Sequence, residues 1–314
     1  MGIMVGKRAR AALVAAGALV LALAGCAGHA ARRAETPSPG ERPVVYASFY
    51  PVADLTRRVV GDRMEVRSII KAGQEPHDFE LQTSDMAEVS KADLVVYNGA
   101  GMEGFIDDLK DNMGGDERFL DLSQGLTLLQ SKDAAEGDHS SVNPHTWLSI
   151  KNAQHELARI YERVCQMDPA GADEYKANYE KSASELRELD QKFETELSKV
   201  PADKRYFVVS HAAFNYLAND YGLNQVAVTG ISPEDEPSAA QLATIADFVK
   251  QHSISTIFFE GKATPKVAET LAKNTGTKTS TLHTMESLTE EEMSRGYVAL
   301  MEQNLDALME SFNA

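Results

Sequence analysis

The stretch AGADEYKANYEKSASELRELDQKFETELSKV, at residues 170–200, contains no proline and is dominated by residues that favour helices. Apolar residues recur in its second half every three or four positions, the spacing of an amphipathic helix, at Leu186, Leu189, Phe193 and Leu197. An unbroken helix of this kind spans roughly 45 Å, which is more than one small lobe needs. We therefore predict a rigid backbone helix at 169–201 that joins two lobes. Two shorter helices with a break near Asn178 are the alternative.

Short apolar runs alternate with amphipathic segments on both sides of this stretch. The runs lie at 44–49, 64–70, 93–98, 119–122, 206–210, 225–229, 256–260 and 279–282. Because strands that alternate with helical segments are typical of parallel sheets covered by helices, we expect an α/β fold. The two groups of strands predict an N-terminal lobe at 43–168 and a C-terminal lobe at 202–314. No convincing sequence match relates the two halves.

Residues 1–26 have the features of a secretory leader. A basic start precedes an apolar run at 11–24 that is short for a membrane span. The leader ends in Leu-Ala-Gly-Cys, which resembles a bacterial lipobox and predicts a lipid on Cys26. An ordinary signal peptide is the alternative, but the chain has only two cysteines, and this favours lipidation. The following residues, 27–42, include Thr-Pro-Ser-Pro-Gly and are expected to form a flexible tether.

The composition narrows the choice of ligands. The chain has 314 residues, of which 43% are hydrophobic and 25% charged, and its formal net charge at pH 7 is −16. This length is sufficient for two domains. The negative charge argues against nucleic acid and anionic lipid surfaces as ligands, and it suits the attraction of cations.

Three histidines and a glutamate stand at wide, nearly even intervals, each in a predicted loop. His77, His211 and Glu286 follow predicted strands, and His145 follows a proline and precedes the single tryptophan. In open α/β sheets the loops after the carboxyl ends of the strands line the ligand crevice. We therefore expect these four side chains to meet in a cleft. Three imidazoles and a carboxylate can form a four-coordinate site for a borderline metal ion. Among these metals, zinc is the first candidate.

Three further residues are weaker candidates for the same site. Glu260 ends a predicted strand and is a reserve fourth ligand or a partner that orients an imidazole. His283 lies three residues before Glu286 and competes with it as a ligand. His139 belongs to an acidic stretch at 133–140, where it is an accessory metal residue or part of a solvated loop.

Several motifs, taken in order, resemble the zinc/manganese solute-binding lipoproteins of bacterial ABC importers. Besides the lipobox they are ASFYP at 47–51, GQEPHDFE at 73–80, NPHTWL at 143–148, VSHAAF at 209–214, EPS at 236–238 and PKVA at 265–268. The resemblance covers the chain from Val44 onward. It implies two α/β lobes joined by one long helix, with the metal in the cleft between the lobes.

The resemblance also implies a ligand set and a cargo. His77, His145 and His211 match ligand positions of the family, and Glu286 matches the fourth. A histidine at the third position is typical of the zinc group, whereas the manganese group usually has a glutamate there. Two departures stand out: Asn143 replaces the aspartate that commonly precedes Pro-His, and the long histidine-rich loop is reduced to the acidic stretch with His139.

These observations predict a monomeric lipoprotein on the extracytoplasmic face of the cell membrane, which captures Zn²⁺ and passes it to the permease of an ABC importer. A manganese- or iron-binding protein of the same family and a surface adhesin are the alternatives. A secreted zinc hydrolase is disfavoured because the sequence has no His-Glu-x-x-His motif and because four protein ligands leave no position for a reactive water. We therefore expect no enzyme activity.

Overall fold

The structure, a computed structural model, describes residues 42–130, 142–260 and 265–314. The leader with Cys26, nearly all of the predicted tether, and His139 lie outside the described residues. Among the described residues, no helix combines the length and the apolar character that crossing a bilayer requires.

The first sheet contains four parallel strands in the order β2-β1-β3-β4. The strands are β1 (Val44–Ala47), β2 (Glu65–Ser68), β3 (Leu94–Tyr97) and β4 (Phe119–Asp121). Every residue of β3 is buried, as expected for a central parallel strand with both faces covered. In register, Val45 pairs with Val66 of β2 and with Leu94 of β3.

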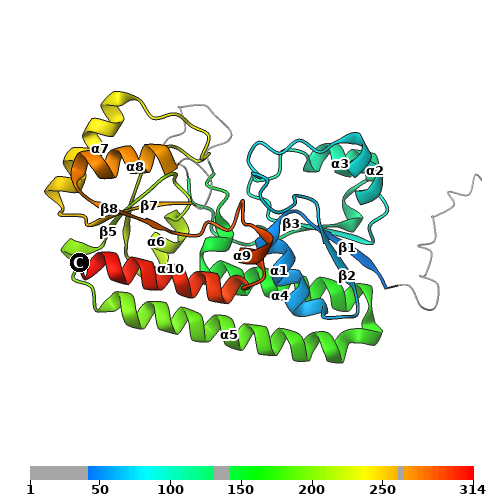
Figure 1. The fold of residues 1–314 in the computed structure, drawn as a ribbon. Helices are drawn as coiled ribbons and strands as arrows, with labels where there is room; N and C mark the ends of the chain where they lie inside the picture. The colour runs from blue at the N-terminus through cyan, green and yellow to red at the C-terminus, as the bar shows by residue number, and fades with distance from the viewer. Residues whose placement is uncertain (1–41, 131–141, 261–264) are drawn as a thin grey trace, which may run out of the picture. The chain divides into compact units, whose positions relative to one another are not determined.

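Helices connect these strands and cover the sheet (Figure 1). They are α1 (Tyr50–Val60), α2 (Thr83–Val89), α3 (Ile106–Met113) and α4 (Ile150–Met167), with short 3-10 turns η1 (Asp116–Arg118) and η2 (Thr146–Leu148). Ser149 caps the N-terminus of α4: its hydroxyl accepts a hydrogen bond from the backbone N–H of Asn152 and so satisfies one free donor of the first turn.

The second sheet repeats the topology of the first, with the order β6-β5-β7-β8 and all strands parallel. Its strands are β5 (Tyr206–Val209), β6 (Asn224–Ala227), β7 (Thr256–Phe259) and β8 (Lys278–Thr281). The helices that follow them are α6 (Asn215–Tyr221), α7 (Ala239–Gln251) and α8 (Pro265–Thr275), preceded by the 3-10 turn η4 (Ala202–Lys204). The eight predicted strands and the two-lobed α/β fold are confirmed.

One long helix runs beneath both sheets (Figure 1). The 3-10 turn η3 (Pro169–Gly171) leads into α5 (Ala172–Ser198), which has 27 residues. The predicted long helix is confirmed and the alternative break near Asn178 is wrong. The Asn178 amide donates to the carbonyl of Val59 in α1, so this polar side chain ties the helix to the first lobe.

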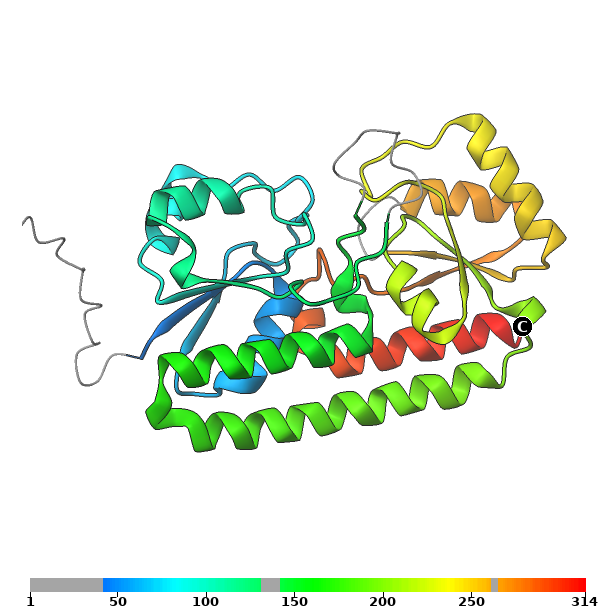
Figure 2. The same ribbon diagram turned by 180° about the vertical axis from the view of Figure 1, so that it is seen from behind.

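The C-terminal segment returns to the first lobe before it ends against the second. It contains α9 (Glu290–Met293) and α10 (Tyr297–Phe312). The hydroxyl of Tyr50 in α1 donates to the carbonyl of Met293, and that of Tyr297 donates to the carbonyl of Trp147. Seen from behind, α4 and α10 both lie along α5 (Figure 2).

The two lobes share one hydrophobic core. Its buried residues include Leu55 of α1, Leu186 of α5, Phe207 of β5 and Leu300 of α10. A separate, smaller core lies between the second sheet and the helices α7 and α8, and includes Ile257. Because apolar packing continues from one lobe to the other, α5 and α10 restrict a wide hinge motion between them.

Candidate metal centre

His77 lies in the loop that follows β2. Gly73 begins this loop with a φ of 76°, a left-handed conformation that glycine adopts without strain. Its backbone N–H donates to the carbonyl of Leu288 in 2.9 Å, which ties the loop to the segment that carries Glu286. The carboxylate of Glu75 accepts from the backbone N–H of His77. The His77 side chain keeps 9% of its surface exposed.

Two asparagines fix the loop that carries His145, one from the same loop and one from directly after β3. The side-chain oxygen of Asn143 accepts from the backbone N–H of His145 and lies 2.8 Å from its Nδ1. The amide of Asn98, directly after β3, donates to the carbonyl of Pro144 in 2.8 Å. One turn further, the indole N–H of Trp147 donates to the carbonyl of Thr284, so this loop also contacts the second lobe.

His211 follows β5 by one residue and faces a carboxylate from the neighbouring strand. Its Nδ1 contacts Oε1 of Glu260, which directly follows β7. Ser210 donates to the same carboxylate oxygen in 2.6 Å, and Thr284 donates to the other oxygen. β5 and β7 lie on either side of the point where the strand order reverses, which is where open α/β sheets bind ligands.

Glu286 follows β8 after a sharp change of chain direction. The preceding residue, Met285, is buried and has a φ of 66°, which is uncommon for a residue with a side chain. Such backbone persists where the surroundings hold it, and it is frequent at binding sites. Here it turns the carboxylate of Glu286 toward the three histidines.

The four predicted ligands converge. One ligand atom from each of His77, His145, His211 and Glu286 can be chosen so that all lie within 4.8 Å of one another. Nε2 of His145 lies 3.2 Å from Nε2 of His77 and 3.1 Å from Nε2 of His211. Oε1 of Glu286 lies 3.1 Å from Nε2 of His77 and 2.9 Å from Nε2 of His145. Two loops of each lobe thus meet in the cleft.

Burial and charge act on the four groups in opposite directions. Burial lowers the pKa of His145 to about 3, since the nearby Glu286 offsets only part of the effect. For His77, burial also lowers the pKa, but the hydrogen bond and charge of Glu286 outweigh it and the net shift is upward. The pKa of His211 rises well above its usual value because Glu260 and Glu286 together outweigh burial. Burial raises the pKa of Glu286, but His211 and His145 hold it well below its usual range.

The donor set fits a zinc ion. Oε2 of Glu286 is buried and has no hydrogen-bond partner among the described residues, and such an atom calls for a specific explanation. A cation bound by this carboxylate supplies one. Three imidazole nitrogens and one carboxylate complete a tetrahedral zinc shell, and the Nδ1 contacts of His145 and His211 leave Nε2 of both rings free to bind.

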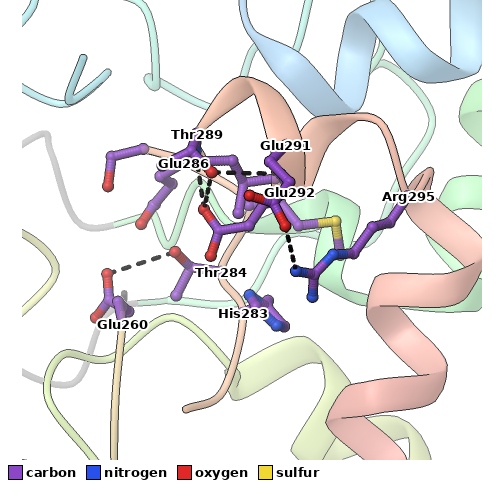
Figure 3. A pocket seen from close by; sticks show the side chains of 11 residues that line it. Glu260, His283, Thr284, Glu286, Thr289, Glu291, Glu292 and Arg295 are labelled. Atoms are coloured by element: carbon purple, nitrogen blue, oxygen red, sulfur yellow. Dashed lines mark hydrogen bonds and ion pairs between the residues drawn. The ribbon is translucent and has the colours of Figure 1, made fainter. Parts of the chain in front are cut away.

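The two weaker candidates that the structure describes are not among the four converging ligand atoms. Glu260 stands behind His211 and is not one of the four converging ligands. His283 is anchored to α10, where Asn304 accepts from its backbone N–H and donates to its carbonyl. A cavity of about 250 Å³ lies beside this segment. Figure 3 shows some of the side chains that line it, among them Glu260, Glu286, His283 and Arg295.

Two residues that support the site were not predicted from the sequence. Asn98 stands at the carboxyl end of β3, the position in the first sheet that corresponds to Glu260 in the second. The strand-end rule that favours Glu260 also applies to Asn98, but an asparagine is not a metal ligand of first choice, so the rule does not predict a role for it. Glu75 is the other: burial raises its pKa to about 7, and the charge of Glu286 adds to the effect.

Two parallel α/β lobes, a long helix beneath both and a buried cluster of metal ligands between them define a class, the bilobal solute-binding proteins for metal ions. The family described as zinc-uptake complex component A, periplasmic (ZnuA), matches residues 45–311. The chain belongs to this family.

Relatives and solved structures agree with this assignment. The high-affinity zinc uptake system protein ZnuA of Bacillus subtilis is 37% identical over 94% of this chain and 95% of its own length. The Zn(II)-bound ZnuA-like domain of Streptococcus pneumoniae AdcA has a TM-score of 0.75 at 35% identity, covering 87% of this chain and 100% of that domain. The zinc-binding protein AdcA of Streptococcus pyogenes is longer, and the match covers 55% of its length.

A second similar structure is described as bifunctional. It is the laminin-binding protein of Streptococcus agalactiae, described as having adhesin and metal-transporting activity. Its TM-score is 0.76 at 33% identity, and the match covers 86% of this chain and 99% of that one.

Proposed function

We propose that this protein captures Zn²⁺ through His77, His145, His211 and Glu286 and delivers it to the permease of an ABC importer. The observation that carries this proposal is the convergence of four ligand atoms within 4.8 Å at the junction of the two lobes, three of them on buried residues and one on the half-buried His77. The Bacillus subtilis relative is named for zinc uptake, and the similar Streptococcus pneumoniae domain is described as Zn(II)-bound.

The donor set supports zinc over manganese as the cargo. Imidazole nitrogen suits zinc, whereas carboxylate and water oxygen suit manganese, and this site offers three imidazoles and one carboxylate. Mn²⁺ remains the alternative cargo. Four protein ligands leave no open position for a reactive water, so we infer that the site stores and releases its ion and catalyses no reaction.

The proposal also covers the cellular location of the protein and the boundaries of its domains. We infer that residues 1–26 are a lipoprotein leader and that Cys26 carries the lipid that anchors the protein on the extracytoplasmic face. One relative, AdcA of Streptococcus pneumoniae, which is 37% identical over 85% of this chain, is named a lipoprotein. We assign residues 43–168 and 202–314 to the two lobes and residues 169–201 to the helix that joins them. We also infer that the protein acts as a monomer.

Adhesion is a second candidate function. It is favoured by one observation, the adhesin activity in the description of the similar Streptococcus agalactiae protein. Binding of laminin by the purified protein, unchanged after removal of zinc, would support an adhesive role that is independent of metal capture.

The decisive experiment for the proposed function is a competitive titration of the metal-stripped protein with Zn²⁺ and Mn²⁺. We expect one equivalent of zinc, bound much more tightly than manganese. His211→Ala removes one of the four ligands and should weaken zinc binding strongly. His283→Ala is the matched control, because this histidine is anchored to α10 outside the cluster.

The possible outcomes separate the alternatives. Preference for manganese would keep the transport role and change the cargo. Loss of zinc in His283→Ala, with none in His211→Ala, would show that the ligand set is wrong. No stoichiometric metal at all would refute the proposal.

A further inference from the structure

The loop between β3 and α3 contains a run of left-handed backbone next to the His145 loop. Gly99, Ala100 and Gly101 have φ values of 78°, 52° and 83°. Two of the three are glycines, but Ala100 has a side chain, and this conformation is uncommon for such a residue. A segment of this kind needs neighbours that hold it, and such segments cluster at ligand sites.

A buried carboxylate holds this loop. Glu103 is 7% exposed, and each of its two oxygens accepts a hydrogen bond from a backbone N–H. Oε1 lies 2.7 Å from the backbone nitrogen of Asn98, and Oε2 lies 3.0 Å from that of Gly99. Hydrogen bonds to a charged acceptor are stronger than those between neutral groups. Without Glu103, two buried N–H groups would lose their partners, which is costly.

Asn98 connects this loop to the two residues that flank His145. Its Oδ1 accepts from the hydroxyl of Thr146 in 2.8 Å, and its amide nitrogen donates to the carbonyl of Pro144 in 2.8 Å. The same nitrogen donates to the carbonyl of Gly99, so the acceptors fix which end of the amide is nitrogen. The side chain is buried with the rest of the residue, which is 1% exposed. The position of this one amide therefore determines the course of the main chain at the ligand.

These contacts reach beyond what the fold of the β3–α3 loop requires. Glu103 is not one of the four converging ligands, and its own printed bonds go to the backbone of residues 98 and 99. A role in the loop alone would end there. Instead, the residue whose backbone Glu103 holds uses its side chain on both neighbours of His145.

We propose that Glu103 is a positioning residue that acts through Asn98, holds His145 where a four-coordinate ion needs it, and so contributes to the preference for zinc. Zinc sites are mostly tetrahedral, whereas manganese favours octahedral oxygen coordination. A His145 loop that cannot shift opposes the expansion that a six-coordinate ion requires. This inference rests on the proposed function, since metal affinity and coordination geometry are its readouts.

The test compares Glu103→Gln with the wild type in purified, metal-stripped protein, with Zn²⁺ and Mn²⁺ buffered by chelators. Glutamine has the same size but keeps only one accepting oxygen, and its NH₂ group faces the second backbone N–H. Burial raises the pKa of Glu103 to about 7, so affinities are compared at pH 8, where the carboxylate is ionised. We expect zinc to bind about fivefold more weakly, the equivalent of one ordinary hydrogen bond, and manganese affinity to change much less.

Bound Co²⁺ reports the coordination geometry directly. Four-coordinate Co²⁺ absorbs visible light strongly, and six-coordinate Co²⁺ absorbs it weakly. We expect a weaker visible band in Glu103→Gln than in the wild type. A residue that only stabilised the fold would lower the melting temperature of the metal-free protein and leave the band and the zinc-to-manganese affinity ratio unchanged.

Asp168→Asn is the matched control for loss of a carboxylate in the same lobe. Asp168 pairs with Arg63 at 2.7 Å, directly after the last residue of α4. The 18 residues of this helix separate it from the His145 loop by roughly 27 Å. We expect a lower melting temperature in this variant, with the zinc-to-manganese ratio and the Co²⁺ band of the wild type.

A second pair of variants keeps the test decisive if Glu103→Gln does not fold. Thr146→Val removes the hydroxyl that donates to Asn98 at nearly constant shape, and Thr146→Ser retains it. We expect weaker zinc binding and a weaker Co²⁺ band in the valine variant, and rescue of both in the serine variant.

Failure of this inference differs from failure of the proposed function. A wild-type protein that binds no zinc would overturn both. If the wild type binds zinc and Glu103→Gln keeps its zinc-to-manganese ratio and its Co²⁺ band, the positioning role alone is overturned. A Thr146→Val variant that binds zinc like the wild type would also overturn it, because the contact between Asn98 and the His145 loop would then have no effect on the ligand.

Discussion

Oδ1 of Asn143 lies 2.8 Å from Nδ1 of His145, so an uncharged amide orients this imidazole. The opposite end of the same amide donates to the carbonyl of Ala212, beside His211, and to Asn215. Asn143 therefore connects two ligand loops that belong to different lobes. His211 has a carboxylate, Glu260, in the corresponding position, and this difference in charge explains why the pKa values of the two buried histidines shift in opposite directions.

Replacing Asn143 tests this connection. Asn143→Ala removes both ends of the amide and should weaken zinc binding about 10- to 100-fold, the usual effect of losing a partner that orients a metal ligand. Asn143→Asp retains the contact with Nδ1 but loses the two donated bonds and adds a charge that raises the pKa of His145. Affinity measured from pH 5.5 to 8.5 should then fall more steeply toward acid pH than in the wild type, because His145 joins His77 and His211 in binding a competing proton. Identical profiles would contradict this assignment.

Glu260 should control the proton that zinc displaces from His211. The charge of Glu260 is the largest of the effects that raise the pKa of this histidine against burial. Glu260→Gln should weaken zinc binding about tenfold and reduce the number of protons released at pH 7. Calorimetry in two buffers with different ionisation enthalpies measures that number. Glu292→Gln, on the same cavity but in the cap of α9, is the control and should release as many protons as the wild type.

Zinc affinity should depend on pH above the range of an ordinary histidine. In the metal-free site the pKa values of His77 and His211 are raised, so both rings hold protons at and above pH 6.5. Zinc must displace these protons, and binding therefore weakens as the pH falls from the alkaline side of neutrality. His145, with a pKa of about 3, does not contribute. An affinity that stayed constant between pH 7.5 and 5.5 would rule out imidazole ligation.

The single tryptophan should report occupancy of the site. The Trp147 ring is buried, and its centroid lies 5.2 Å from that of His145. Binding of a cation to this imidazole changes the electric field at the indole, so the fluorescence of Trp147 should change on addition of zinc. The change should be complete at one equivalent of zinc. In His145→Ala the signal should be lost at the same zinc concentrations. A signal that persisted unchanged in that variant would arise from another process.

The sequence predicted the fold well because its signals are local. Apolar runs such as Leu94–Tyr97 and the periodic leucines of α5 each determine their own element, and the alternation of elements implies parallel sheets. The four candidate ligands could be singled out because each stands in a loop after a strand or beside a proline, and because the motifs around them resemble a known family.

The supporting contacts could not be predicted in the same way. Asn98 supports the site only through the carbonyl of Pro144 that it contacts, and no pattern in the sequence reveals this contact. The left-handed backbone at Met285 likewise has no signature in a methionine. These features arise from tertiary packing. They cannot be predicted from the type of a single residue or from its spacing in the sequence.

The core that continues through α5 and α10 has a consequence for cooperativity. Leu55 of the first lobe and Phe207 of the second belong to the same apolar cluster, so unfolding either lobe would expose surface of the other to water. Heat or denaturant should therefore melt both halves in a single transition, despite their separate sheets. Neither half, produced alone as 43–168 or 202–314, would have a closed interior, and each should be prone to aggregation.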